Sequence, residues 1–109
     1  MFKLDKTNKE TVLHSFAGGT ADGEFPYAGL VRDTSGNLYG TTYQGGASGW
    51  GTVFKVDGTD KETLLHSFAY STDGGYPYAG LVRDTAGNLY GATENGGPAG
   101  AGTVFKLVP

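Results

Sequence analysis

The stretch PYAGLVRDTSGNLYGTT occupies residues 26–42 and returns almost unchanged as PYAGLVRDTAGNLYGAT at residues 77–93. A second landmark, LHSFA at residues 13–17, returns at residues 65–69. Self-similarity at a fixed period is the mark of a repeat architecture, in which each copy forms one supersecondary unit. The fold must therefore be one that stacks equal units side by side.

The boundaries of the copies follow from aligning residues 2–53 with residues 54–104. One gap near Ala21 is needed, and 36 of 51 aligned positions are then identical. This identity is too high for unrelated segments, so the chain is two tandem copies of one unit. A third copy starts at residues 105–109.

Each copy shows strand and turn signals only. Ala28–Asp33 and Asn37–Thr42 flank a short turn in which Gly36 supplies the positive φ that a hairpin loop demands. A third strand is predicted at Thr52–Asp57, after a Gly-rich connection, and a fourth at Glu62–Phe68. Glycine and proline interrupt every window with helical spacing, so we expect essentially no helix.

Four antiparallel strands in every 40–50 residues or so are typical of a β-propeller blade. The predicted third and fourth strands carry apolar side chains on both faces, which suits a blade held between two neighbours. We therefore predict an all-β fold with two four-stranded antiparallel propeller blades. Each buried Phe or Leu would contribute roughly 1.5–3 kcal/mol at the contacts between blades.

Two family resemblances rest on these motifs. The hairpin sequences at residues 33–39 and 84–90 resemble the first hairpin of NHL-type propeller blades. The whole unit, with GTVFK, LHSF, PYAGLV and GNLYG, more closely resembles the bacterial tandem repeat known as GloVer. That resemblance implies repetitive, extracellular, surface-sorted proteins of unknown activity, and it implies no catalytic residues.

Two blades cannot close a ring, because they leave apolar faces and strand edges in water. The sequence begins within a third strand (Phe2–Asp5), continues into a fourth (Thr11–Phe16) and ends after another third strand (Thr103–Leu107). We therefore expect a homo-oligomer in which Lys9–Phe16 of one chain completes the blade begun by Tyr78–Leu107 of its neighbour. Three chains would give six blades and four chains eight. Met1–Asp5 duplicates the strand at Thr103–Leu107, so one of the two must be displaced, fray or pair elsewhere.

Composition argues against several partners. The net charge is −3, with no basic stripe to neutralise phosphates, so we expect neither nucleic acid nor an anionic membrane as a partner. The apolar runs are only a few residues long, so no segment is predicted to span or target a membrane. The 109 residues include no cysteine, which excludes disulfides and thiolate metal sites.

The polar motifs give no catalytic site. His14 and Ser15, like His66 and Ser67, are adjacent on a predicted strand and point to opposite faces, so they cannot form a dyad. We expect each histidine to be held between blades. Zinc would need further ligands, and the two histidines lie a whole blade apart.

The acidic and Gly-rich loops also have structural interpretations. Asp22, Glu24 and Asp73 lie in loops without the alternating ligands of a calcium site, so we expect them in Asp-Gly turns. The Gly-rich stretches at residues 45–51 and 96–102 precede strands, whereas phosphate loops precede helices. The sequence predicts no enzyme activity, no cofactor and no metal.

Arg32 and Arg83, each followed by an aspartate (Asp33 and Asp84), end the strand that would line the central channel. In a closed ring these residues recur around one mouth of the channel. We expect the arginines to bridge neighbouring blades through carboxylates, and the alternative is an anionic ligand.

The two copies differ mostly in loops, where sequence drift is the simplest explanation. The differences nevertheless change which side chains the loops present: Tyr43, Gln44 and Trp50 in the first copy, Glu94 and Asn95 in the second. Aromatic rings beside amide and carboxyl groups suit the faces and hydroxyls of sugars. The predicted function is a non-catalytic module that self-assembles into a ring, with a carbohydrate as its candidate ligand. The alternative is a purely structural assembly repeat, natural or engineered, with no ligand.

Overall fold

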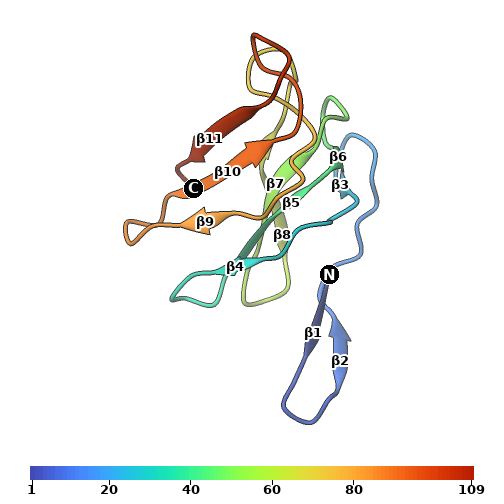
Figure 1. Cartoon of the computed structure of the whole chain (residues 1–109). Coiled ribbons are helices and arrows are strands. Elements are labelled where there is room, and N and C mark those ends of the chain that lie inside the picture. Colours follow the sequence, from blue (N-terminus) through green and yellow to red (C-terminus); the bar gives the residue numbers. More distant parts are fainter.

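The computed structural model describes all 109 residues as eleven β-strands with no helix (Figure 1). The strands form several small antiparallel sheets, which confirms the all-β prediction and the expected absence of helix. The chain has no helix that is long and apolar enough to cross a membrane.

The first sheet has four antiparallel strands in chain order and crosses the boundary between the aligned sequence copies. In describing the structure we therefore call the unit at residues 31–67 the first copy and the unit at residues 82–107 the second. The strands of the first copy are β4 (Val31–Arg32), β5 (Leu38–Thr42), β7 (Thr52–Val56) and β8 (Glu62–Ser67). The pairing of β7 with β8 shifts between Val53 and Phe54, where a β-bulge interrupts the register. The last three strands were predicted with nearly these bounds, whereas the first, predicted over Ala28–Asp33, spans only Val31–Arg32, and the bulge was not predicted.

The second copy forms the first three strands of the same arrangement. They are β9 (Val82–Arg83), β10 (Leu89–Thr93) and β11 (Thr103–Leu107). β10 and β11 pair over five residues in the same register as β5 and β7. No strand of the chain pairs with the other edge of β11, which is the position that β8 fills in the first copy.

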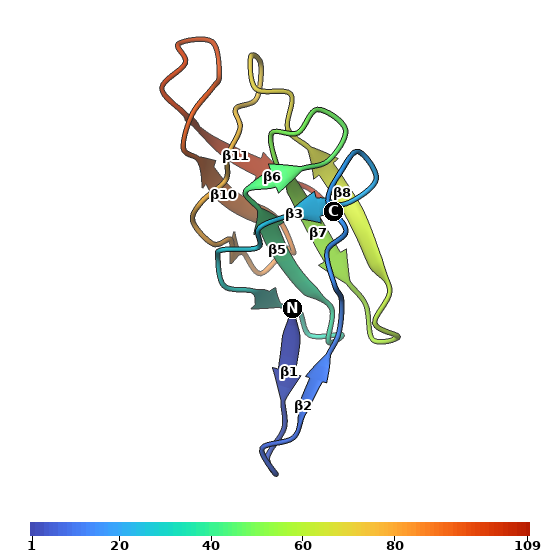
Figure 2. The ribbon, with the colours of Figure 1, turned by 90° about the vertical axis from the view of Figure 1, so that its right-hand side faces the viewer.

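The N-terminus forms a separate hairpin of β1 (Phe2–Leu4) and β2 (Glu10–Val12). Phe2 pairs with Val12 just as Phe54 pairs with Leu64 in the first copy. The hairpin extends away from the two larger sheets, as both views show (Figures 1 and 2). β1 and β2 therefore pair as the third and fourth strands of the first sheet do, although no further strand lies beside them.

An aspartate turn keeps this isolated hairpin in shape. Asp5 Oδ1 accepts hydrogen bonds from the Thr7 amide at 2.8 Å, the Thr7 hydroxyl at 2.7 Å and the Lys9 amide at 3.0 Å. Asp57 makes the same three contacts in the β7–β8 turn. Because side chain and backbone satisfy each other locally, the turn forms without tertiary support.

Two short strands were not predicted, namely β3 (Gly23–Glu24) and β6 (Gln44–Gly45), which pair with each other. Two-residue pairs are too short to leave a propensity signal in a glycine-rich sequence. The pairing depends on glycine at position 45, where φ is +84° and an added Cβ would lie 2.7 Å from the carbonyl oxygen of Asp22. The Gly-rich stretch is thus a tight connection.

The core lies between the sheets of the two copies. Tyr39, Val53 and Phe68 of the first sheet pack with Leu81 and Leu89 of the second. These side chains lie in the strands of the two sheets or directly beside their ends, so the contact between copies holds each copy in place.

One aromatic contact between copies occurs twice. The ring of Phe68 meets that of Phe105 edge-to-face with centroids 5.1 Å apart, and Phe16 meets Phe54 in the same way at 5.0 Å. Gly40 makes room for this contact, because a Cβ there would lie 2.8 Å from the Phe54 ring. The same edge-to-face contact between phenylalanine rings is thus made on both sides of the first sheet.

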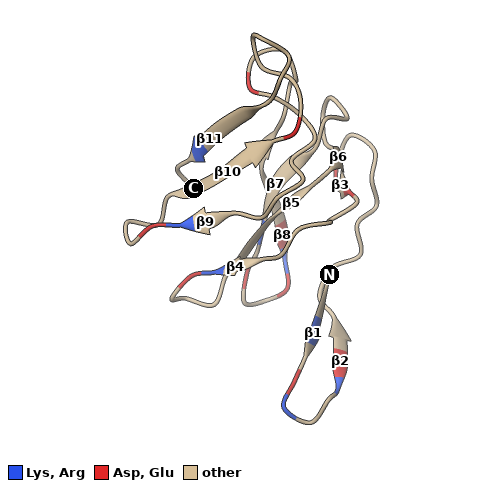
Figure 3. Ribbon diagram, viewed as in Figure 1, with Lys and Arg blue, Asp and Glu red and all other residues tan.

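The positions of charged residues are scattered over strands and turns, with acidic and basic residues interspersed (Figure 3). Basic residues do not gather along any one strand or sheet in this view.

Candidate functional site

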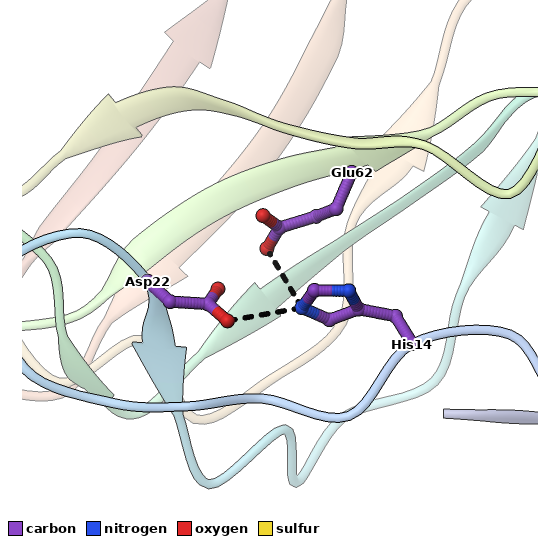
Figure 4. Close-up of side chains that lie close together, drawn as sticks. All are labelled: His14, Asp22 and Glu62. Carbon is purple, nitrogen blue, oxygen red and sulfur yellow. Dashed lines mark hydrogen bonds and ion pairs between the residues drawn. The ribbon is translucent and has the colours of Figure 1, made fainter.

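Three polar side chains from separate segments meet beside the first sheet (Figure 4). His14 follows β2, Asp22 precedes β3, and Glu62 begins β8. His14 Nε2 lies 3.0 Å from Asp22 Oδ2 and 3.6 Å from Glu62 Oε2. We call these three residues the His14 cluster.

The Asp22 carboxylate is fixed by backbone donors. Its Oδ2 accepts a hydrogen bond from the Ala17 amide at 2.9 Å, and its Oδ1 accepts one from the Gly23 amide at 2.8 Å. Burial by itself would raise the pKa of Asp22, but these and the neighbouring side-chain hydrogen bonds outweigh burial and lower it. Asp22 is therefore an ionised, firmly oriented partner for His14.

Glu62 is the least satisfied member of the cluster. Its side chain is only 10% exposed, and its Oε2 is buried without a hydrogen-bond partner. Burial, followed by the neighbouring Asp22 carboxylate, raises the pKa of Glu62 to about 8. Burying a carboxyl group in this way is unfavourable unless a proton or a cation neutralises it.

A second histidine–aspartate pair repeats two thirds of the cluster. His66 Nε2 lies 2.6 Å from Asp73 Oδ2, and Asp73 Oδ1 accepts a hydrogen bond from the Ala69 amide at 2.8 Å. This pair is more open, with side chains 37% and 33% exposed, against 21% and 11% for His14 and Asp22. Its third member is missing, because the counterpart of Glu62 is Glu10, an exposed residue of the N-terminal hairpin.

A small cavity of about 140 Å³ marks the vacant place beside the second pair. His66 and Asp73 line it on one side. The rest of the lining comes from β7 (Val53), from the residue after β8 (Phe68) and from β11 (Phe105, Lys106 and Leu107). In the first copy the corresponding place beside β7 is taken by Glu62 of β8.

The sequence predicted structural histidines and Asp-Gly turns but not that the two belong together. No hydrogen bond joins His14 to Ser15 or His66 to Ser67. A signal was present, because each histidine precedes an Asp-Gly pair, at a spacing of 8 residues for His14 and 7 for His66. The contribution of Glu62 had no local signal, since it comes from the next sheet.

The predicted channel residues have mostly local contacts within one chain. Asp33 accepts hydrogen bonds from the Asn37 amide at 2.9 Å and the Tyr39 hydroxyl at 3.0 Å, and Asp84 repeats this pattern. The Asn37 side chain is the main cause of the low pKa of Asp33, about 2. Inside the chain the ion pairs involve the histidines, and neither arginine takes part. Arginine bridges between separate chains stay a prediction.

Two of the predicted ligand residues belong to an aromatic contact between the two copies. We call this contact the seam, and it consists of Tyr43, Trp50, Tyr70 and Tyr76. Trp50 packs on Tyr70 with ring centroids 4.4 Å apart and meets Tyr76 at 5.2 Å. Tyr43 stacks on the same Tyr76 at 4.8 Å, and its hydroxyl donates to Glu94 Oε1 at 3.2 Å. Trp50 and Tyr43 therefore join the two copies through Tyr76.

The two amide residues of the predicted set are parts of backbone pairings. Gln44 lies in β6 opposite Glu24, and Asn95 exchanges backbone hydrogen bonds with Gly75 at 2.9 and 3.2 Å. The structure thus does not bring the five predicted ligand residues into one pocket.

Sequence comparison identifies the repeat. The model of the Gloeobacter/Verrucomicrobia repeat matches residues 1–109. The chain belongs to this family. The match confirms the resemblance to the bacterial tandem repeat, while the likeness to NHL-type blades stays a prediction. No curated protein and no solved structure matches the chain.

Within this Gloeobacter/Verrucomicrobia repeat protein, the contacts that occur twice include local aspartate turns, the histidine–aspartate pair and the edge-to-face phenylalanine contact. The phenylalanine contact joins one sheet to the segment packed against it. The chain therefore repeats both its turns and its packing contacts.

Proposed function

We propose that this chain is a non-catalytic assembly module, which completes a closed β-propeller by packing against further repeats of its own kind. The observation that carries the proposal is a difference between equivalent residues. Val53 is fully buried under the second copy, whereas Val104, its counterpart, is 85% exposed. The outer face of the second copy thus has the composition of an interface but no neighbour.

The opposite end of the chain shows the same mismatch. Phe54 is 1% exposed between sheets, whereas its counterpart in the hairpin, Phe2, is 64% exposed, and Leu4 is 58% exposed. Covering one such side chain contributes roughly 1.5–3 kcal/mol. Apolar groups exposed at both ends favour head-to-tail association, which is heterologous and closes when the rotation permits.

The free edge of β11 indicates which strand of a second copy fits there. In the first copy that position is held by β8, whose residues Glu62 and Thr63 have the counterparts Glu10 and Thr11 in β2. A second copy of this chain therefore carries the matching strand.

In the isolated chain, β1 occupies the edge of β2 that β11 of a neighbour would need. β1 holds β2 by three residue pairs, all of them exposed. β11 is held to β10 by five pairs and by a hydroxyl contact of 2.8 Å between Thr93 and Thr103. We propose that the weaker pairing yields, so that β1 leaves β2 and β11 of the neighbour takes its place.

Polar groups complement each other in this arrangement. Val56 pairs with Glu62 in the first copy, and the same register pairs Leu107 with Glu10 of a second chain. Glu10 would then enter the cavity beside His66 and Asp73 and complete a second cluster of the His14 type. The requirement for a carboxyl group at that place favours a repeat of the same family as the partner.

The ring size follows from two blades per chain. Three chains give six blades and four give eight, both within the usual range for propellers. The experiment that tests the proposal is the native mass of the wild-type chain beside that of Val104→Asp, in which a charge on the open face should prevent association.

A second candidate function, sugar binding, is favoured by an aromatic surface patch next to the seam. Phe25, Tyr27 and Tyr78 are 43%, 59% and 59% exposed, and Tyr27 contacts both others with ring centroids 5.7–5.8 Å apart. Glycan-array binding that Tyr27→Ala and Tyr78→Ala abolish would support it. If the array gives no signal, assembly is the only function that we propose for the chain.

A further inference from the structure

We infer that the His14 cluster is a binding site for a divalent transition-metal ion, for which Zn²⁺ is the best match. All three residues belong to one chain, so the site does not depend on assembly. The inference departs from the sequence-based expectation of no metal, which assumed that each histidine lacked further ligands.

The spacing of the ligand atoms suits such an ion. His14 Nε2 lies 3.0 Å from Asp22 Oδ2 and 3.6 Å from Glu62 Oε2, and the three ligand atoms all lie within 4.8 Å of one another. In a tetrahedral zinc site with bonds of about 2.0–2.2 Å, neighbouring ligand atoms lie about 3.3–3.6 Å apart. Both distances from the imidazole nitrogen are thus close to those of a bound state.

Glu62 provides an independent indication of a missing partner. Its side chain is nine-tenths buried, and its Oε2 is directed at His14 without receiving a hydrogen bond. Buried polar atoms are nearly always paired, so an orphan of this kind calls for an explanation. A cation placed between Glu62, Asp22 and His14 supplies the absent partner.

The chemistry of the donors selects the class of ion. One imidazole and two carboxylates suit zinc and its neighbours among the first-row metals, whereas Ca²⁺ takes six to eight oxygen ligands. Asp22 is held by the amides of Ala17 and Gly23, which orient it as outer-shell groups orient metal ligands. Three protein ligands leave one coordination position for water or another ligand.

The test is a titration of Zn²⁺ into the full chain, from which metal has first been removed with a chelator and the chelator then removed. Calorimetry measures the heat of binding, and thermal unfolding measures the change in the midpoint. We expect Zn²⁺ to bind at this cluster and to raise the midpoint, because an ion that binds only the folded state stabilises it. Glu62→Gln keeps the shape of the side chain and should weaken binding roughly tenfold or more, since even outer-shell changes weaken metal sites by about 10–100-fold.

The matched control is Glu94→Gln, which removes an exposed carboxylate outside the His14 cluster and should leave the Zn²⁺ affinity unchanged. Native mass is measured on the same samples, so that failure to assemble and failure to bind metal are told apart. The inference is overturned by the absence of both heat and stabilisation, by equal Zn²⁺ affinity in wild type and Glu62→Gln, or by stronger binding of Ca²⁺ than of Zn²⁺.

Discussion

Val53 and Val104 occupy the same position in the two copies, yet Val53 is fully buried and Val104 is 85% exposed. The two strands have the same local sequence, TVFK, and each pairs with the strand before it in the same register. The difference is therefore due to the sheet that covers Val53 and to β8 beside it, neither of which has a counterpart at Val104. This pair of residues provides a built-in comparison between a completed and an uncompleted face.

Truncating each valine should have different effects. Val53→Ala removes buried methyl groups and should lower the free energy of unfolding by about 1.5–3 kcal/mol, whereas Val104→Ala should leave the unassembled chain almost unchanged. Urea denaturation at low protein concentration measures both. Equal losses for the two variants would show that Val104 is already covered within a single chain.

Cysteine pairs test the proposed register between chains, because the chain has no cysteine of its own. In the first copy Lys55 pairs with Thr63, so Lys106 should pair with Thr11 of a neighbour. The double variant Thr11→Cys/Lys106→Cys should therefore form intermolecular disulfides, visible as a ladder on a non-reducing gel.

Two matched pairs control this experiment. Lys55→Cys/Thr63→Cys should close within one chain, and Thr11→Cys/Val104→Cys should not cross-link, because it is out of register. A ladder of equal strength from the out-of-register pair would mean random collision, and no ladder from the in-register pair would contradict the strand exchange.

The pH dependence of stability should report the burial of Glu62. Its pKa rises from 4.5 to about 8 on folding, so the folded state holds the proton more tightly than the unfolded state. In the metal-free chain this contribution is complete below about pH 4.5 and is lost as the pH rises toward 8. Asp22 and His14 both lie beside this carboxyl group.

Replacing Glu62 by Gln should therefore flatten this part of the stability profile, measured by denaturant unfolding in the presence of a chelator. Glu94→Gln, which removes a surface carboxylate, should keep the wild-type slope. A Glu62→Gln profile parallel to wild type between pH 4.5 and 8 would contradict the buried, proton-binding role.

The aromatic residues should separate into a structural group and a surface group. Trp50 packs against Tyr70 and Tyr76, so Trp50→Ala should lower the free energy of unfolding by about 3 kcal/mol. Tyr27 is 59% exposed, and Tyr27→Ala should change stability by less than about 0.5 kcal/mol. Thermal unfolding of the two variants side by side gives the comparison. A Trp50→Ala variant as stable as the wild type would show that Trp50 contributes little to the packing between the two copies.

Most of the fold could be predicted because strands and turns have strong local signals here. Gly36 and the β-branched and aromatic residues on either side of it indicate a hairpin, and repetition of the pattern fixes the number of strands. The pairing of β3 with β6 and the bulge near Val53 could not be predicted, since both depend on contacts across the sheet.

The candidate site was less predictable. His14 and Asp22 both stood out in the sequence, but each was interpreted alone. Glu62 joins them only because the first sheet packs against the segment before it, and no pattern within one copy shows this. The set of Tyr43, Gln44, Trp50, Glu94 and Asn95 came from differences between copies, and such differences do not show whether a side chain lies in a pocket or in a packed seam.

The mass of the chain in solution tests the central claim most directly. One chain weighs 11.3 kDa, and multi-angle light scattering on the wild-type protein should give three or four times that mass, whereas Val104→Asp should give the single-chain value. A wild-type sample that is fully folded by circular dichroism and still has the mass of one chain would contradict the proposed assembly.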